Sequence, residues 1–380
     1  MTPPTIPLSS PDITEPEIEA VAATLRSPHL SLGPRLPEFE AAFTALTGVP
    51  HAIAVSSGTA GLHLALLALN MGAGAEVIVP SFTFIAAANA IRYVGATPIF
   101  VDIDPLTLNL SPAAVEAAIT PRTRAILAVH TFGIPADMPA LTALARHHNL
   151  FLIEDACEAI GATLSTPGQP AKPIGSFADI AVFAFYPNKQ ITTGEGGMIV
   201  TRDPDLAARM RSLRNQGRTA SGHWLQHTEL GYNYRLSDIA CTLGIGQMHR
   251  LPEILARRET IARLYHHHLA SETSLTLPPL DIPNLRISWF VYVVRLTADF
   301  TPAYRDQIIH TLEQASIGCG RYFAPIHLQR AYAEFPLTSP LPITEFVASR
   351  TIALPFFNRI NKSQIATVCD TLKQAIRRIH

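Results

Sequence analysis

Hydrophobic positions in the first half of the chain follow two alternating patterns. Short, continuous apolar runs are separated by stretches in which apolar residues recur with the period of a helix. The runs predict strands over residues 51–56, 76–80, 97–101, 125–131, 151–154 and 180–185. The periodic stretches predict helices over residues 14–25, 37–46, 59–69, 84–94, 112–118 and 138–148. This alternation favours an α/β fold with a mostly parallel central sheet and helices on both faces.

The pattern changes beyond Gly197. Helical periodicity returns over residues 206–214, 237–269, 302–315 and 362–379, with an interruption expected near Pro252. Residues 217–234 predict a polar loop, and residues 288–296 are β-rich. A chain of 380 residues is longer than a domain with a single hydrophobic core usually is, so we predict two domains. The large domain spans residues 1–250, and a smaller C-terminal α+β domain spans residues 251–380.

Charge and hydropathy exclude several classes of protein. A net charge of −1 provides no basic surface for nucleic acid, and 48% hydrophobic residues are typical of a folded chain. No uncharged apolar run reaches the roughly 18–20 residues of a membrane span, and no secretory leader pattern opens the chain. The four cysteines have no framework spacing, so we expect free thiols and a cytoplasmic protein.

The chain contains three consecutive histidines, at residues 266–268, and histidine is a common metal ligand. Consecutive residues of a helix point about 100° apart, so these side chains cannot converge on one ion. We therefore expect no metal.

Lysine is rare in this chain, and one lysine stands in a chemically suggestive place. The lysines are Lys172, Lys189, Lys362 and Lys373. An apolar run leads to Lys189, which opens a turn dense in Thr and Gly. Burial disfavours the charged form of an amine, and uncharged lysine is the nucleophile that forms Schiff bases with carbonyls, pyridoxal 5′-phosphate (PLP) included. The alternative interpretation is a surface lysine in an ordinary turn.

Two further loops follow predicted strands. The turn over residues 57–60 (Ser-Gly-Thr-Ala) joins a strand to a helix whose free N–H groups can hold a phosphate, although such a turn is also an ordinary helix cap. Asp155 follows a buried strand, where a carboxylate needs a cationic partner such as a protonated pyridine nitrogen, or else caps the next helix. Open α/β sheets bind ligands at the carboxyl ends of their strands. The phosphate turn, Asp155 and Lys189 together are the three anchors that a PLP site needs.

With these motifs the chain resembles the DegT/DnrJ/EryC1/StrS family of nucleotide-sugar aminotransferases, and in particular its perosamine-synthase-like members. The resemblance runs over nearly the whole chain. The matching stretches are residues 57–66, 80–84, 154–162, 189–197, 231–238 and 322–328. The resemblance implies a fold-type-I aminotransferase, active as a homodimer with active sites shared between the subunits.

The resemblance also implies roles for individual residues. Lys189 forms the Schiff base with PLP and moves the proton during transamination, and Asp155 pairs with the pyridine nitrogen. The other expected cofactor-binding residues are Gly58, Thr59 and Ala60 at the phosphate, Phe84 on the ring face, Glu158 near O3′, and Asn233 at the phosphate of the neighbouring subunit. The expected substrate contacts are Arg235, His327 and the loop of Trp224, with a packing role or a surface ion pair as the alternative.

Two positions depart from the family pattern. Ala184 stands where many members carry a phosphate-binding serine, so the phosphate relies more on backbone amides, Asn233 or Asn188. Glu158 stands where glutamine or histidine is common, which is either a substrate-selecting difference or a tolerated variant. Dehydrating relatives replace the lysine by histidine, so the retention of Lys189 favours transamination.

We therefore predict a PLP-dependent aminotransferase that moves an amino group from an amino acid, L-glutamate by expectation, to a nucleotide-linked keto sugar in a ping-pong cycle. Glu158 and Asn188 are features shared with perosamine-synthase-like members, and this resemblance implies a 4-keto-6-deoxyhexose as the acceptor, with amination at C4. Three alternatives remain: amination of a non-sugar cyclic ketone, a non-catalytic regulatory or binding protein on the same scaffold, and a hydrolase based on Cys157. The position of Cys157 beside Asp155 favours an inert thiol over the hydrolase.

Overall fold

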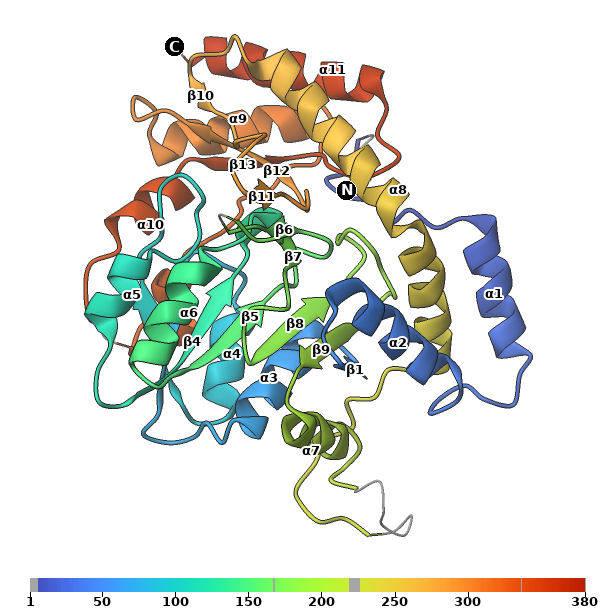
Figure 1. The fold of residues 1–380 in the computed structure, drawn as a ribbon. Helices are drawn as coiled ribbons and strands as arrows, with labels where there is room; N and C mark the ends of the chain where they lie inside the picture. Colours follow the sequence, from blue (N-terminus) through green and yellow to red (C-terminus); the bar gives the residue numbers. More distant parts are fainter. Residues whose placement is uncertain (1–5, 167, 219–225, 336, 380) are drawn as a thin grey trace.

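The computed structural model describes residues 6–166, 168–218, 226–335 and 337–379. The centre of the fold is a seven-stranded sheet with the order β1-β9-β8-β5-β4-β2-β3 (Figure 1). These strands are β1 His51–Val55, β2 Glu76–Pro80, β3 Thr97–Val101, β4 Thr123–Val129, β5 Phe151–Asp155, β8 Ile180–Ala184 and β9 Gly197–Thr201. All run in one direction except β9, which pairs antiparallel with both of its neighbours. The predicted α/β fold with a mostly parallel sheet is confirmed.

Helices cover both faces of this sheet. Figure 1 shows α5 (Pro112–Ala118) and α6 (Met138–His147) in front of it, and α3 (Gly58–Ala68) and α4 (Ala86–Tyr93) behind it. Apolar residues of α2 (Arg35–Thr47) and of α8 (Asp238–Leu269) join the core of the first face, and those of α7 (Pro204–Arg214) join the core of the second. Alternate strand residues feed the two cores: Leu152 lies in the first and Ile153 in the second. By the same alternation, Asp155 lies on the face of the sheet that α3 covers.

The C-terminal part builds a smaller sheet, β10-β12-β13, with its own apolar core. Its elements are β10 Leu275–Thr276, β12 Tyr292–Leu296, β13 Thr351–Leu354, α9 Pro302–Gln314, α10 Pro342–Ala348 and α11 Lys362–Arg377. The N-terminal Ile6 also lies in this core and pairs with Ile317. A third sheet joins β6 (Thr163–Leu164) to β7 (Lys172–Pro173) and β11 (Leu285–Arg286).

Helix α8 connects the two larger units. It passes through Pro252 without a break, so the predicted interruption is wrong. Proline removes one backbone hydrogen bond, but buried residues on both sides of it, Leu251 and Ile254, hold the helix against the core. The helix also crosses the position between residues 250 and 251, and a domain boundary there stays a prediction.

Strand β9 is absent from the sequence prediction. Two consecutive glycines, Gly196 and Gly197, introduce it and are typical of a loop, yet Met198, Ile199 and Val200 are fully buried. The strand returns antiparallel beside β8, so the intervening segment with Lys189 is a hairpin loop rather than a crossover. The β-rich segment predicted over residues 288–296 contains a shorter strand, since β12 begins at Tyr292.

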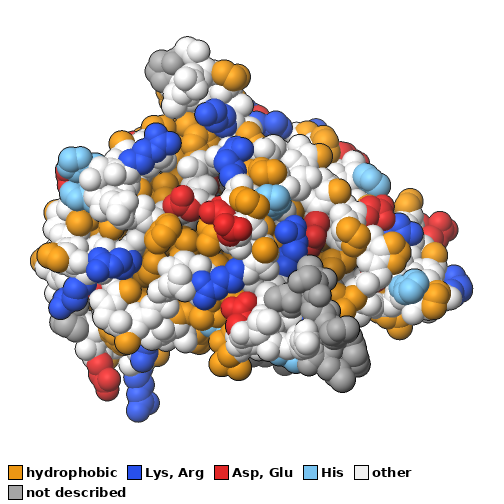
Figure 2. Space-filling view, turned by 60° about the horizontal axis from the view of Figure 1, so that its bottom comes forward, with side chains coloured by type: hydrophobic (Ala, Val, Ile, Leu, Met, Phe, Trp, Pro, Cys, Tyr) orange, Lys and Arg blue, Asp and Glu red, His pale blue; other side chains and the backbone are white. Residues whose placement is uncertain are grey.

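The surface carries charges of both signs. On the face shown in Figure 2, basic and acidic side chains are interspersed among apolar ones. No helix within the described ranges is both long and apolar enough to cross a bilayer.

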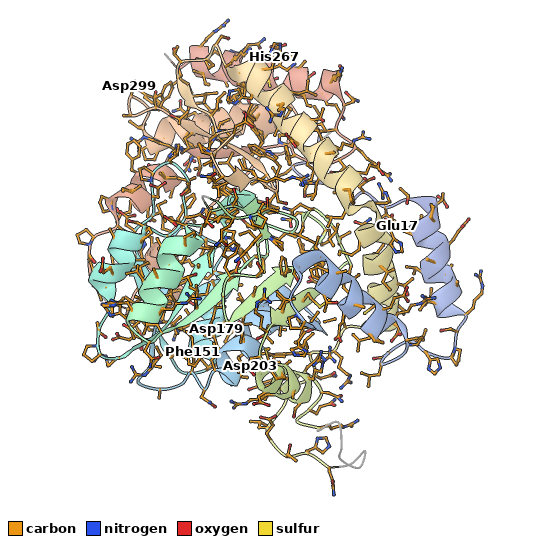
Figure 3. All side chains as sticks on the ribbon, in the orientation of Figure 1. Glu17, Phe151, Asp179, Asp203, His267 and Asp299 are labelled. Carbon is orange, nitrogen blue, oxygen red and sulfur yellow. The ribbon has the colours of Figure 1, made fainter. Side chains whose placement is uncertain are left out.

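Asp12 ties the start of the chain to α8 and to the C-terminal part. Its carboxylate accepts hydrogen bonds from Arg250 at 2.9 Å, Arg359 at 2.8 Å and Asn358 at 3.2 Å. Arg250 also pairs with Glu17, which lies on α1 (Glu15–Leu25) toward α8 (Figure 3). Burial alone would raise the pKa of Asp12, but the hydrogen bonds from its three partners together hold that pKa below its ordinary value.

We expect Asp12→Ala to lower the free energy of unfolding by about 2 kcal/mol at neutral pH. Because the folded-state pKa is depressed, this contribution is complete above the ordinary carboxyl pKa of 3.8 and is lost as the pH falls through the folded-state value. Urea titrations at pH 7 and below the ordinary carboxyl pKa measure the difference. The exposed Asp370→Ala is the control, and a deficit for Asp12→Ala that stays the same at both pH values contradicts the interpretation.

Candidate active site

The ends of β1, β5 and β8 enclose a cavity of about 630 Å³. All three strands point the same way, so their carboxyl ends share one edge of the sheet. Phe151 and Asp179, at the amino ends of β5 and β8, mark the opposite edge (Figure 3). The described residues that line the cavity include Gly58, Thr59, Phe84, Asp155, Cys157, Glu158, Ala184, Asn188, Lys189, Phe290, Arg321 and Tyr322. The three predicted anchors therefore meet in one place.

Lys189 lies in the loop between β8 and β9. Its N–H donates to Tyr186 O at 2.9 Å, which closes a tight turn and directs the side chain to the cavity wall. Nζ lies 3.4 Å from Oε1 of Glu158 and 3.9 Å from the ring centre of Phe290. The side chain is only 13% exposed, so Lys189 is not an ordinary surface lysine.

Asp155 and Glu154 are adjacent, but they point to opposite faces of the sheet and differ in their partners. Glu154 is fully buried and accepts hydrogen bonds from His130 and from the N–H groups of residues 175, 177 and 178. Asp155 is 7% exposed, and its hydrogen-bond partner in the described part of the chain is Cys157, through the N–H at 3.1 Å and through the thiol. No lysine, arginine or histidine among the described residues pairs with it. A buried carboxylate of this kind is costly unless a cation binds it, which fits a protonated pyridine nitrogen.

The turn before α3 provides backbone donors at the cavity. Ser57 caps the helix, since its side chain accepts the N–H of Ala60 at 3.0 Å. The N–H groups of Gly58 and Thr59 have no acceptor among the described residues. Free N–H groups at a helix N-terminus fit a phosphate. Ala60 differs from the expectation, because its N–H is already used and the residue does not line the cavity.

Gly58 sits where a side chain has no room. A Cβ there would lie 2.7 Å from Cβ of Ala184 and 2.9 Å from Sγ of Cys157. We expect Gly58→Ala to displace the turn and weaken PLP binding about tenfold, because overpacking a tight contact costs on the order of 1–3 kcal/mol. Absorbance titration of the cofactor-free protein with PLP measures the affinity. Gly72→Ala is the control, because a Cβ at Gly72 meets nothing closer than 3.8 Å; equal affinities for both variants contradict the assignment.

Glu158 and Cys157 complete the floor of the cavity. Glu158 accepts the N–H of Phe132 at 2.8 Å. Burial raises the pKa of Glu158 above its ordinary value. The charge of Lys189 and the hydrogen bond from Phe132 lower this pKa, but the net shift is upward. Burial, with the neighbouring Asp155, also raises the pKa of the Cys157 thiol well above its ordinary value. The thiol therefore stays protonated, which argues against a hydrolase that uses Cys157 as nucleophile.

Phe84 precedes α4, and its side chain is 62% exposed and lines the cavity, so it does not serve as core packing. Three other predicted site residues do not line the cavity of this chain. Asn233 is exposed, and Arg235 donates to Asn215 at 2.9 Å and Gln216 at 2.7 Å. His327 is buried against Ser81, with Nδ1 2.7 Å from its Oγ, as the packing alternative predicts. Trp224 lies outside the described residues.

The C-terminal part supplies cavity residues that the sequence did not reveal. Phe290 precedes β12, and Arg321 and Tyr322 follow α9. Residues 322–328 belong to a matching motif, but neither Phe290 nor Arg321 stands in a pattern that indicates a site. Only the folded chain brings them to the lysine loop.

Comparison with known proteins decides the family. The sequence profile of the DegT/DnrJ/EryC1/StrS aminotransferase family matches residues 11–373. The chain belongs to this family. It is 43% identical to GDP-perosamine synthase of Caulobacter vibrioides. The similarity extends over 348 residues, 91% of each chain.

Solved structures of similar proteins agree with this assignment. DesV of S. venezuelae, solved in complex with a ketimine intermediate, is 36% identical with a TM-score of 0.88 over 98% of both chains. Spr1654 of Streptococcus pneumoniae, solved in a PLP form and a PMP form, is 29% identical in the PLP form, with a TM-score of 0.91 over 99% of both chains. Our chain is thus a PLP-dependent aminotransferase, which confirms the predicted family, enzyme class and cofactor. A non-catalytic scaffold is set aside.

The geometry fits this chemistry. When bound, PLP supplies an aldehyde that combines with amines and a ring that withdraws electrons from the reacting carbon. The Nζ of Lys189 is the one side-chain amine among the described residues of the cavity, where it can take up and return a proton. Phe290, Tyr322 and Phe323 form aromatic walls of the cavity, where the rings of Phe290 and Phe323 both stack on that of Tyr322.

Proposed function

We propose that this enzyme aminates a nucleotide-linked keto sugar and takes the amino group from L-glutamate. The observation that carries the proposal is the 43% identity to GDP-perosamine synthase across 91% of both chains. A 4-keto-6-deoxyhexose is the acceptor that this similarity favours, together with Glu158 and Asn188 in the cavity wall. The alternative, a non-sugar cyclic ketone, has no comparable support.

The same proposal assigns the site residues. Asp155 holds the pyridine nitrogen, the amides of Gly58 and Thr59 hold the phosphate, Phe84 faces the ring, and Lys189 binds the cofactor and moves the proton. Asn233 is exposed and does not line the cavity of its own chain, which suits a contact with the cofactor of a second subunit in a homodimer. The four cysteines are free, which suits a reducing cytoplasm.

The acceptor is tested by incubating the PLP-loaded enzyme with L-glutamate and a GDP-linked 4-keto-6-deoxyhexose. Mass spectrometry is expected to show the amino sugar nucleotide and an equal amount of 2-oxoglutarate. A non-sugar cyclic ketone in a parallel reaction is expected to give no amine. Amination of the cyclic ketone alone would overturn the sugar assignment.

Arg321 is expected to bind the anionic part of a substrate. Besides Lys189 it is the one lysine or arginine among the described cavity residues. Its Nε pairs with Asp306 at 2.9 Å, and the side chain remains 47% exposed. We expect Arg321→Gln to raise KM for the substrate about tenfold with little change in kcat, because it removes a charge-assisted contact made before and during the reaction. Steady-state kinetics measure both constants. Arg330→Gln, an exposed arginine outside the cavity, is the control, and an equal change in KM there contradicts the assignment.

A further inference from the structure

The amine of Lys189 rests on an aromatic ring. Phe290 is 2% exposed, and its ring centre lies 3.9 Å from Nζ. The amine also has a polar partner, Glu158. The distance from Nζ to Oε1 of Glu158 is 3.4 Å, which is long for a charge-assisted hydrogen bond. A cation over the face of an aromatic ring at this distance is attracted by the negative charge of the ring face. The ring of Phe290 therefore contacts the lysine ammonium in addition to Glu158.

Buried hydrogen bonds fix Phe290 in this position. Arg258 of α8 is 3% exposed and donates to Trp289 O at 2.6 Å and to Phe290 O at 2.8 Å. Burial lowers the pKa of Arg258 to about 9, so the guanidinium stays charged at neutral pH. No carboxylate of the described chain binds Arg258, so its charge is directed to these carbonyls and to Asn358.

The segment before Phe290 is tied to the lysine loop itself. Gln190, the residue after Lys189, donates to Ser288 O at 3.0 Å and to Glu158 O at 2.6 Å. On the other side, the Ser288 N–H donates to Gly133 O at 3.0 Å. Hydrogen bonds between residues next to Lys189 and residues next to Phe290 thus keep the lysine and the ring beside each other. In the chain, 100 residues separate Gln190 from Phe290.

We propose that Phe290 is a positioning residue for Lys189, whose ring holds the lysine ammonium in the cavity whenever the amine is not joined to the cofactor. The inference rests on the proposed role of Lys189 as the amine that leaves and rejoins the cofactor in each cycle. A lysine side chain has many rotamers, and a released amine that explores them returns to the reacting carbon less often. The ring restricts this search without taking part in a covalent step.

Nuclear magnetic resonance of the full-length protein with isotope-labelled lysine tests the proposal directly. The chain has only four lysines, so four side-chain signals are expected, and Lys189→Ala identifies one of them. In the cofactor-free protein, ring current should shift the Cε protons of Lys189 upfield of the other three. Phe290→Leu should remove this shift, and Phe290→Tyr should retain it. Phe82→Leu, which removes a buried ring outside the cavity, should leave it unchanged.

The inference is overturned if the Lys189 signal of the wild-type protein lies among the other three, or if Phe290→Leu leaves it in place. The wild-type spectrum decides even if Phe290→Leu fails to fold. This test needs no turnover, so it stands apart from the proposed function.

In the loaded enzyme, Phe290→Leu should lower kcat about tenfold with an unchanged KM for the sugar, since the ring contacts the lysine and not the substrate. A rise in KM with an unchanged kcat would instead make Phe290 a substrate contact.

Discussion

Replacement of Lys189 by alanine is expected to lower the rate of amino transfer about 10⁴-fold. Nζ is the one side-chain amine in the described lining of the cavity, so no second amine there can replace it in the proton transfer. The variant should still bind PLP, because Asp155 and the turn before α3 are unchanged. Single-turnover kinetics with L-glutamate, followed by absorbance, measure the loss.

Lys172→Ala is the matched control, since Lys172 lies in β7 and does not line the active-site cavity. It should retain the wild-type rate. Because small amines can enter a space left by a truncated lysine, added methylamine should restore part of the lost rate in Lys189→Ala. Retention of more than about one hundredth of the rate without added amine would contradict the role of Lys189 in proton transfer.

Replacement of Asp155 by asparagine is expected to lower kcat about 10²- to 10³-fold and to weaken PLP binding. The amide keeps the size of the side chain and an oxygen for the Cys157 N–H, but it removes the negative charge that faces the cavity. Asp155, if it holds the pyridine nitrogen as proposed, would favour the protonated nitrogen, so its loss would make the bound ring a weaker electron sink. Steady-state kinetics at saturating PLP separate the loss in rate from the loss in affinity.

Glu154→Gln is an informative control, because Glu154 is the neighbouring carboxylate on the other face of β5. Its oxygens satisfy His130 and three backbone N–H groups, so we expect a loss of stability with little change in kcat for the folded protein. Should Glu154→Gln reduce kcat as much as Asp155→Asn, a general effect on the strand would explain both.

The central site was predictable from the sequence because parallel strands bring their carboxyl ends to one edge. The turn over residues 57–60, Asp155 and Lys189 each follow a strand, and this geometry makes them meet. Strand β9 was missed because its short apolar run starts at glycine, and only pairing with β1 and β8 gives it structure. The break at Pro252 was wrong because tertiary packing outweighs the local cost of proline.

The rest of the cavity depends on contacts between distant parts of the chain. Hydrogen bonds from Arg258 and Gln190 to the segment around Phe290 place its ring beside Lys189. These residues are far apart in the chain, so no local sequence pattern predicts the contact. For Asn233, the predicted site needs a second subunit, so the single chain leaves its role as a prediction. His327 shows the opposite case, where a family motif residue takes a packing position beside Ser81.

The visible absorption of the purified enzyme, loaded with PLP and then mixed with L-glutamate, tests the central claim most directly. The wild-type protein should be yellow, lose its visible band when glutamate is added, and regain it when the GDP-linked keto sugar follows. Lys189→Ala should bind PLP but fail to complete this cycle. A wild-type protein that takes up no PLP, or a Lys189→Ala variant that cycles as the wild type does, would contradict the account.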